Sequence, residues 1–382
     1  MPIFVRNTDS HGLNRQVLNM LKKLDWYIIR NFLSTFFFTA LIFTMIAVSI
    51  DFSEKVEKFV EEPITKRQIL LDYYPGFILF IDGLLWPLFA LIAVIFFTSR
   101  MAFNSEIISI FNAGVSFRRL MRPYLFGAGV IAFLHLAGNH FFIPKVTERK
   151  LEIEGQYLDK NKRKKEKSSD FHFFISPDTK IYIGIFTRQD SSAQHFRVEH
   201  FKDSKMVSVL KAARAQWIGP PNKWRLINYE IREFDGDKET LISRRKDQKD
   251  TTFNFMPSDF LEEAEAHTSM TTPKLVQYLG KQKARGVGSA QRYEVELQRR
   301  TAEPFSIFIL TLIGMAVASR KVRGGMGLHL AMGIAIGAIF VFVSRFAIVF
   351  ASGKIIPVLL GIWLPNILFA IPAFYLIRNA QK

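Results

Sequence analysis

The sequence predicts a membrane α+β protein, with six transmembrane helices and a β domain inserted between helices 3 and 4. Hydrophobic residues make up 49% of the 382 residues, but they gather in long blocks near both ends. Each block is long enough for the roughly 20 apolar residues that one membrane span needs. The polar middle alternates apolar with polar residues over short segments, which is the pattern of half-buried strands.

Six segments are long and apolar enough to be spans: residues 28–50, 75–98, 122–143, 303–319, 326–350 and 355–377. No small-residue cleavage site follows the first segment, so we interpret it as an anchor and not as a removed signal peptide. Residues 1–23 are expected to form a cytoplasmic tail. Translation could begin at Met1 or at Met20.

Lys and Arg lie in four regions that share one side of the membrane if there are six spans. These residues are Lys22, Lys23, Arg30, Arg100, Arg118, Arg119, Arg122, Arg320, Lys321, Arg323, Arg378 and Lys382. Because cytoplasmic loops carry the excess of Lys and Arg, both termini are expected in the cytoplasm. Membrane orientation then explains the net charge of +17 better than a nucleic-acid partner does.

The polar middle is expected on the other side of the membrane. Its alternating segments are FHFFIS, KIYIGIF, HFRVEHF, KMVSVLKAARAQWI and KWRLINYEIREF, and turn signals such as GPPN and DGD separate them. Short strands at this spacing are typical of a sandwich or a jelly roll. We place this domain at 145–270 and a stalk of two helices at 271–301. The membrane regions are then 24–144 and 302–382.

The residue patterns argue against several site chemistries. The chain has no Cys, which excludes disulfides and thiolate ligands. Its eight His residues are scattered and form no HExxH pair, so we expect no metal site. No GxxxxGK[ST] phosphate loop is present, so this chain is expected to hold no cofactor and to hydrolyse no ATP itself.

Three stretches carry a resemblance to a known family: NSEIISIFNAGVS, YEVELQRRTAEPFSIFILTLIGMAVASR and GKIIPVLLGIWLPNILFAIPAFYLIR. With the order of the parts, they resemble the lipopolysaccharide-export permeases, the LptF/LptG or YjgP/YjgQ family, from about Leu24 to Arg378. The stretch IDFSEKVEKFVEE leans toward the LptG branch. The resemblance implies a multi-pass protein in the inner membrane of a Gram-negative bacterium that transports without catalysis.

The resemblance also implies partners and a route. Two such permeases pair and bind a dimeric cytoplasmic ABC ATPase. They lift lipopolysaccharide from the outer leaflet of the inner membrane and pass it through periplasmic β-jelly-roll domains to bridge proteins. Two other classes are alternatives from the residues alone: a membrane-anchored periplasmic sensor or binding protein, and a secondary transporter. The latter should have buried carboxylates in matching halves, and only Asp82 is a candidate.

Residues 104–114 are expected to form a short amphipathic helix between the second and third spans. Ser105 suits the N-cap, Glu106 suits the positive end of the helix dipole, and Gly114 can end the helix in a left-handed conformation. An interfacial helix in the headgroups is the alternative. The resemblance implies a coupling helix that docks on the ATPase, with Ile110 and Phe111 filling a groove. The expected coupling residues are Ser105, Glu106, Ile107, Ile110, Phe111 and Gly114.

Lipid A carries phosphates, so a permease that extracts it is expected to place cations near the outer membrane boundary. The candidates are Lys55, Lys58, Arg149, Lys150 and Arg345. Members of the LptG branch often have a basic residue where this chain has Asp51, so we expect the cationic set to be redistributed to Lys58, Arg149 and Arg345. The alternative is that these side chains only flank spans and extend to the headgroups.

Gly333 and Gly337 form a GxxxG pair in the fifth span, which permits close approach of another helix. The resemblance places this span against the first span of the partner permease, as a lateral gate. Packing within the chain is the alternative.

Overall fold

Six helices of the described chain are long and apolar enough to cross a membrane, as the sequence predicts. The computed structural model describes residues 10–158, 167–187, 190–203, 205–220, 222–236, 238–253, 255–257, 266–284, 290–320, 322 and 324–380. The chain divides into two compact units. The helical unit comprises Met1–Asp51, Ile78–Phe142 and Gln298–Lys382, and the second unit comprises Phe52–Phe77 and Ile143–Leu297.

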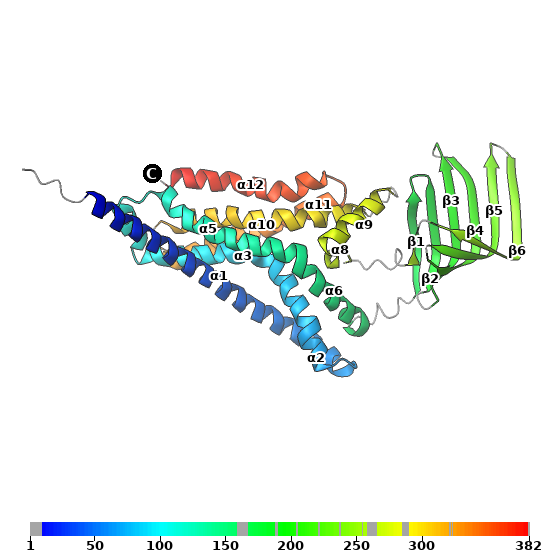
Figure 1. Cartoon of the computed structure of the whole chain (residues 1–382), viewed down its shortest axis with the longest axis horizontal. Helices are drawn as coiled ribbons and strands as arrows, with labels where there is room; N and C mark the ends of the chain where they lie inside the picture. The colour runs from blue at the N-terminus through cyan, green and yellow to red at the C-terminus, as the bar shows by residue number, and fades with distance from the viewer. Residues whose placement is uncertain are drawn as a thin grey trace, which may run out of the picture. The chain divides into compact units, whose positions relative to one another are not determined.

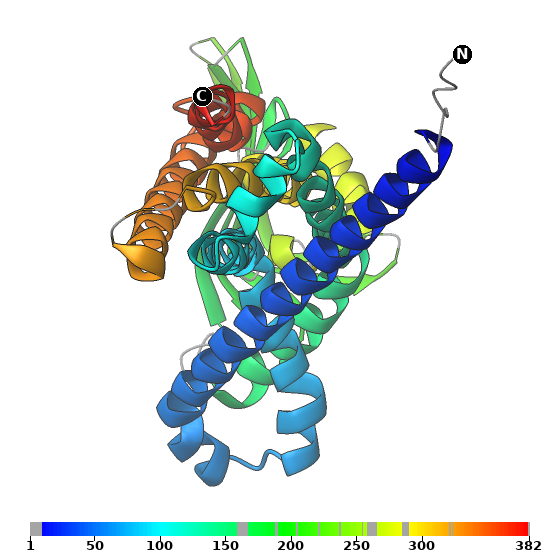
Figure 2. The same cartoon turned by 90° about the vertical axis from the view of Figure 1, so that its left-hand side faces the viewer.

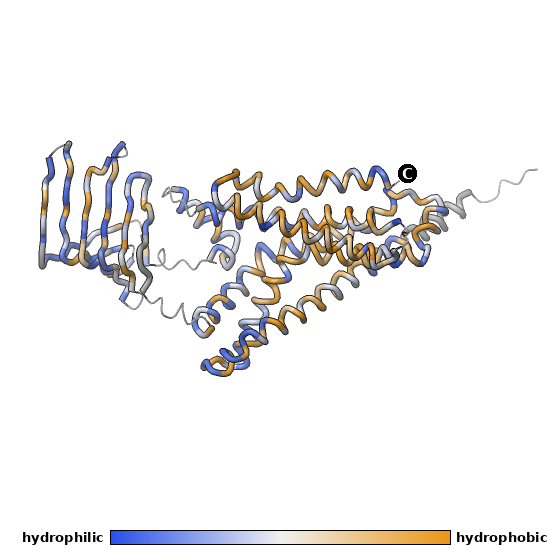
Figure 3. The backbone as a smooth tube through the Cα atoms, turned by 180° about the vertical axis from the view of Figure 1, so that it is seen from behind, coloured by the Kyte–Doolittle hydropathy of each residue, from blue (hydrophilic) through white to orange (hydrophobic). Residues whose placement is uncertain are grey.

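Six long helices carry the candidate spans, and Figures 1 and 2 show them from two sides. They are α1 (Ser10–Glu61), α3 (Tyr74–Phe103), α5 (Phe117–Ala137), α10 (Ala290–Ala318), α11 (Gly325–Ser352) and α12 (Val358–Asn379). Residues 10–23, expected as a tail, are helical and belong to α1. Hydrophobic residues run along all six helices (Figure 3).

The core of the helical unit lies around α3. Leu91, Val94 and Ile95 of α3 are fully buried among apolar residues of α1, α5 and α10. Phe32 of α1 is equally buried, and it lies where a Cβ at Gly127 of α5 would come within 2.7 Å of its ring. Small residues thus let the helices approach closely. In a membrane the hydrophobic effect does not drive helices together, so close packing of this kind stabilises their association.

The helix that carries the third span continues beyond residue 143, where the sequence predicts that the span ends. After α5 the helical run continues through η2 (Gly138–Phe142), α6 (Ile143–Ile153) and η3 (Glu154–Leu158), and the first strand begins only after Leu158, at Lys167. One face of α6 is buried, which keeps this polar stretch helical beyond the apolar segment. The second unit, to which α6 belongs, also contains α2 (Lys66–Gln68) and η1 (Ile69–Tyr73).

Six strands form one antiparallel sheet: β1 (Lys167–Ser176), β2 (Thr179–Thr187), β3 (Ser192–Lys202), β4 (Lys205–Gly219), β5 (Lys223–Asp235) and β6 (Lys238–Thr252). Each strand pairs with the next in sequence, so the described sheet is a meander. The membrane α+β class is confirmed, whereas the jelly-roll form stays a prediction. Trp224, Phe196 and Phe255 lie in the buried core of the sheet.

Two short helices and one long one follow the sheet in sequence. They are α8 (Ala266–Ser269), α9 (Thr272–Ala284) and the start of α10. Leu275 and Leu279 of α9 pack with Tyr293 of α10 in a small apolar cluster. The two helices predicted at 271–301 are therefore present, and the second continues without a break into the fourth span.

Candidate functional site

The predicted coupling segment forms α4 (Glu106–Asn112), a two-turn helix between α3 and α5. Its start differs from the prediction. Ser105 occupies the N-cap position with a left-handed backbone (φ 64°), and its side chain makes no capping hydrogen bond. A left-handed N-cap lacks the extended backbone from which a serine hydroxyl normally reaches the second or third helical N–H. Ser116 caps the following helix instead, by accepting from the backbone N–H of Arg119 (3.3 Å).

Gly114 ends α4 as predicted. Its φ of 81° is left-handed, and two hydrogen bonds close the end: Gly114 N to Phe111 O at 2.9 Å and Val115 N to Ile110 O at 3.3 Å. This is the bonding of a Schellman motif, which satisfies the carbonyls left free at a helix end. The turn allows α5 to begin at Phe117, only five residues after α4 ends.

The exposed apolar face of α4 differs from the predicted one at Ile107. Ile107 is 1% exposed and belongs to the core of the helical unit, and Ile110 and Phe111 are partly buried against that core. Ile108 is 45% exposed, and Phe103, just before α4, is 60% exposed. The apolar surface that α4 offers to a partner therefore includes Ile108, whereas Ile107 anchors the helix.

Glu106 lies at the exposed start of α4 with two neighbours. The Tyr27 hydroxyl of α1 donates to Oε2 of Glu106 at 3.2 Å, and Nδ2 of Asn104 donates to Oε1 at 3.4 Å. The carboxylate thus has a fixed position and remains partly exposed. Near the other end of the segment, Asp25 of α1 pairs with Arg119 of α5.

Two of the predicted lipid-binding cations share one carboxylate in the second unit. Nζ of Lys55 lies 3.4 Å from Oε1 of Glu154, and Nζ of Lys150 lies 3.5 Å from Oε2. Lys55 also donates a very short hydrogen bond to the hydroxyl of Tyr73 and lies over the Tyr73 ring, 4.9 Å from its centre. Lys150 is 7% exposed and Lys55 is 22% exposed, so this cluster is largely buried.

The other predicted cations of this unit are more accessible. Arg149 is paired with Asp72 at 3.8 Å, a contact in which 68% of the arginine side chain remains exposed. Lys58 is exposed near the end of α1. Exposed pairs of this kind contribute little stability, so these two side chains can exchange partners at low cost.

Arg345 lies in the helical unit and lines a small, mostly apolar pocket of about 80 Å³. The pocket is also lined by Arg299 and Glu303 of α10, which form an ion pair at 2.7 Å, and by Asn366 of α12, which donates to the carbonyl of Ala302 at 2.8 Å. An arginine in a span needs a partner or a wet cavity. Arg299, Glu303 and Asn366 supply the polar part of this lining.

The glycine pair of the fifth span packs inside the chain. A Cβ added at Gly333 would lie 2.4 Å from Cδ1 of Ile95, and one added at Gly337 would lie 2.3 Å from Cδ1 of Leu88. Both neighbours belong to α3. The close approach that the GxxxG spacing predicts is therefore made with α3, and the contact with a partner's first span stays a prediction.

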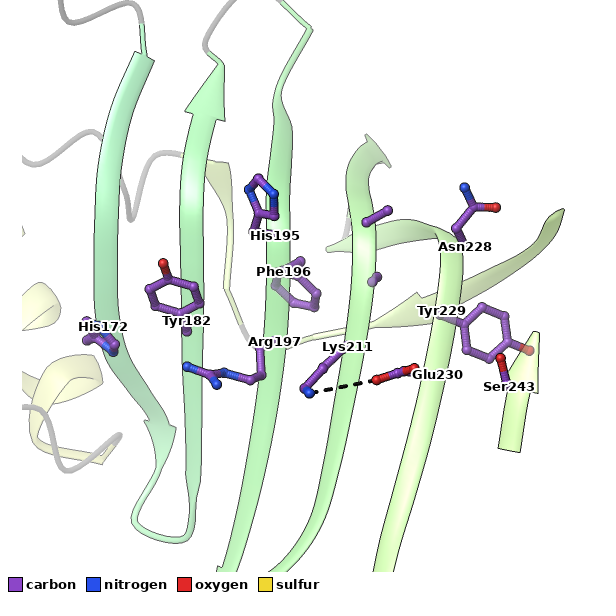
Figure 4. A pocket seen from close by; sticks show the side chains of 12 residues that line it. His172, Tyr182, His195, Phe196, Arg197, Lys211, Asn228, Tyr229, Glu230 and Ser243 are labelled. Atoms are coloured by element: carbon purple, nitrogen blue, oxygen red, sulfur yellow. Dashed lines mark ion pairs between the residues drawn. The ribbon is translucent and has the colours of Figure 1, made fainter. Parts of the chain in front are cut away.

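A hollow of about 920 Å³ lies on one face of the sheet (Figure 4). One row of cross-strand neighbours runs through it: His172, Tyr182, Arg197, Lys211, Glu230 and Ser243. Its charges are largely paired, because Lys211 lies 3.7 Å from Glu230 and Arg197 lies 3.0 Å from Glu199. This polar surface has no strong charge of one sign, and no catalytic constellation is evident in it.

Two carboxylates on the sheet have lowered pKa values, and both serve the sheet itself. The hydrogen bond from Ser192, and then the charge of Arg214, lower the pKa of Asp190. The hydrogen bond and charge of Arg225 lower the pKa of Asp250. A depressed folded-state pKa adds stability above the unfolded pKa, and this stability is lost as the pH falls through the folded pKa. No cluster of three His, Asp or Glu residues that could hold a metal is found among the residues searched.

These features define a class: a multi-pass membrane protein with six candidate spans and a separate antiparallel sheet. The model of the family "Lipopolysaccharide export system permease LptF/LptG" matches residues 26–379. Because the match covers almost the whole chain, this protein belongs to the LptF/LptG family, and it is a permease component of lipopolysaccharide export in the inner membrane. A search among curated proteins found no match.

Proposed function

We propose that this chain extracts lipopolysaccharide from the inner membrane with energy from a separate cytoplasmic ABC ATPase that docks on α4. The observation that carries the proposal is α4 itself, a short exposed helix at the position of the NSEIISIFNAGVS stretch, within a chain that matches the family from residue 26 to 379. A permease that lacks a phosphate loop needs such a contact to receive energy from another polypeptide.

The orientation follows from the Lys and Arg distribution. With both termini in the cytoplasm, the connection from α3 to α5 is cytoplasmic and the sheet is periplasmic. In this orientation α4 faces the ATPase, and the sheet passes lipid to a periplasmic bridge. A secondary transporter is less well supported, because it should have buried carboxylates in matching halves and Asp82 is the only candidate.

The docking surface combines one charge with a small apolar patch. Glu106 presents a carboxylate held by Tyr27, and Ile108 and Phe103 present exposed apolar side chains. Ile107, Ile110 and Phe111 hold α4 against the helical unit. An apolar side chain that enters a groove, with a charge that sets the register, is a common way for a helix to bind a partner.

Lipid phosphate would meet the accessible cations first. Lys58 and Arg149 are exposed, whereas Lys55 and Lys150 are already paired with Glu154. Arg345 would act from the helical unit, where it lines a small pocket. Phosphate is well matched to arginine and lysine because charge-assisted hydrogen bonds are short and strong.

The chain would work with a second permease of the same family, and its IDFSEKVEKFVEE stretch favours the LptG branch. The outward face of α11 is apolar and exposed at Phe342, Phe346 and Val349. This face remains available for the partner's first span, since the glycine face is occupied by α3.

The test is co-purification of the ATPase with variants of α4. Glu106→Arg reverses the charge and Ile108→Glu places a charge in the apolar patch, so each should abolish ATPase association while membrane insertion is unchanged. Glu57→Arg is the matched control, because Glu57 is an exposed glutamate far from α4 in the sequence. Undiminished co-purification with both α4 variants contradicts the proposal.

A further inference from the structure

The beginning of α1 holds both sides of the segment that carries α4. Asp25 accepts two hydrogen bonds from Arg119: Nη1 to Oδ1 at 2.9 Å and Nη2 to Oδ2 at 2.5 Å. Two residues further along α1, Tyr27 donates to Glu106 at 3.2 Å. Glu106 is the first residue of α4, and Arg119 is the third residue of α5. The helix α1 therefore bonds to the chain at the start of α4 and again just after it.

The Asp25–Arg119 contact is a specific one. A bidentate guanidinium–carboxylate pair fixes the relative orientation of its partners as well as their distance. The side chains of Arg119 and Asp25 are 25% and 29% exposed, so water and salt screen this pair less than a fully exposed one. Such a contact resists sliding between α1 and α5.

The surroundings brace the same contacts. The ring of Tyr27 packs against Phe97 of α3, with ring centres 6.1 Å apart. Ile107 of α4 is buried in the core of the helical unit. The turn at Gly114 and the cap at Ser116 make the connection between α4 and α5 short. Because this connection is short, we expect Glu106 and Arg119 to move together with α4.

We propose that the Asp25–Arg119 pair and the Tyr27–Glu106 hydrogen bond form a clamp that passes a displacement of α4 to α1. Asp25, Tyr27 and Arg119 are then positioning residues for lipid extraction. The inference rests on the proposed function, because an ATPase must act on α4 to displace it. The helix α1 runs from Ser10 to Glu61 without a proline, the commonest cause of a sharp kink, so it can carry the displacement along its length.

The experiment uses the complex of this chain with its second permease and ATPase, reconstituted in vesicles with and without lipopolysaccharide. Three quantities are measured: the ATPase retained, the basal rate of ATP hydrolysis, and the factor by which lipopolysaccharide stimulates that rate. Asp25→Asn opens the clamp at the Asp25–Arg119 pair and leaves Tyr27, which holds the docking carboxylate Glu106, unchanged. We expect ATPase retention and the basal rate to be preserved, and the stimulation factor to fall by about fivefold, the lower end of ordinary coupling between two sites.

A charge swap separates the clamp from general stability. Asp25→Arg with Arg119→Asp rebuilds the pair in the opposite sense and should restore much of the stimulation that Arg119→Asp alone removes. Arg118→Gln is the matched control, because Arg118 is exposed and adjacent, and it should leave stimulation unchanged. Stimulation that survives the open clamp, or a swap that restores nothing, overturns the clamp alone. A wild-type complex that retains no ATPase overturns the proposed function, and the clamp with it.

Discussion

At the scale of single residues, Gly333 and Gly337 let α11 approach α3 more closely than a larger residue would allow. The atoms that a new Cβ would meet are the ends of Ile95 and Leu88, which are flexible side chains. Rotation of these ends can make room for one methyl group. It cannot make room for a whole branched side chain in a packed interface.

Gly337→Leu should therefore destabilise the helical unit by about 1–3 kcal/mol, the usual cost of overpacking, whereas Gly337→Ala should cost much less. The measurement is thermal or denaturant unfolding of the protein in detergent. Gly327→Leu on the same helix is the control, because a Cβ there meets no atom within 4 Å. Equal effects of the two leucine substitutions would show that α11 does not pack on α3 through Gly337.

The residues of α4 and its two ends show which structural features single residues predict from a sequence. Gly114 was predictable because a left-handed helix end favours glycine whatever surrounds it. The capping bond of Ser105 was predicted wrongly, because the sequence does not show the backbone angle at which α3 ends. The burial of Ile107 was also missed. Adjacent isoleucines differ by one position around a helix, and only the packing of α4 against the helical unit decides which one is buried.

At the scale of elements, the length of α4 is set by the turn at Gly114. A β-branched residue at its φ of 81° is strained by roughly 1–2 kcal/mol, whereas asparagine tolerates this region. We expect Gly114→Val to reposition the end of α4 and to weaken ATPase association about tenfold, while Gly114→Asn retains it.

The measurement is the affinity of the purified permeases for the ATPase. Ala113→Val provides the control, since Ala113 is exposed and has a φ of −79°, which valine accepts. If Gly114→Val and Ala113→Val bind the ATPase equally well, the backbone conformation of Gly114 is irrelevant to docking.

Among the elements, the apolar spans were predicted well and the polar extensions were not. A span is visible in a sequence because nearly every residue is apolar. The helical run to Leu158 is polar overall and is held by one buried face, which hydropathy does not detect. Strand β6 was missed for a similar reason. Its sequence, KETLISRRKDQKDTT, is mostly polar, as suits a strand at the edge of a sheet.

At the scale of the whole molecule, the proposed orientation has a direct test, because the chain has no Cys and every introduced thiol is unique. Ser109→Cys on α4 and Ser243→Cys on the sheet both replace exposed serines. A membrane-impermeant maleimide should label Cys at 243 from the periplasm and Cys at 109 only from the cytoplasm. Labelling of position 109 from the periplasm contradicts the orientation and the docking of α4 together.

If Lys55 and Lys150 bind lipid phosphate as proposed, the glutamate that they share bears on how the lipid leaves. An incoming phosphate would take over lysines that already have a counter-ion, so the event is an exchange of one anion for another. Departure is the same exchange in reverse, with Glu154 ready to reoccupy its place. In the proposed lipid path, Glu154 would then pair with both lysines again as the phosphate leaves.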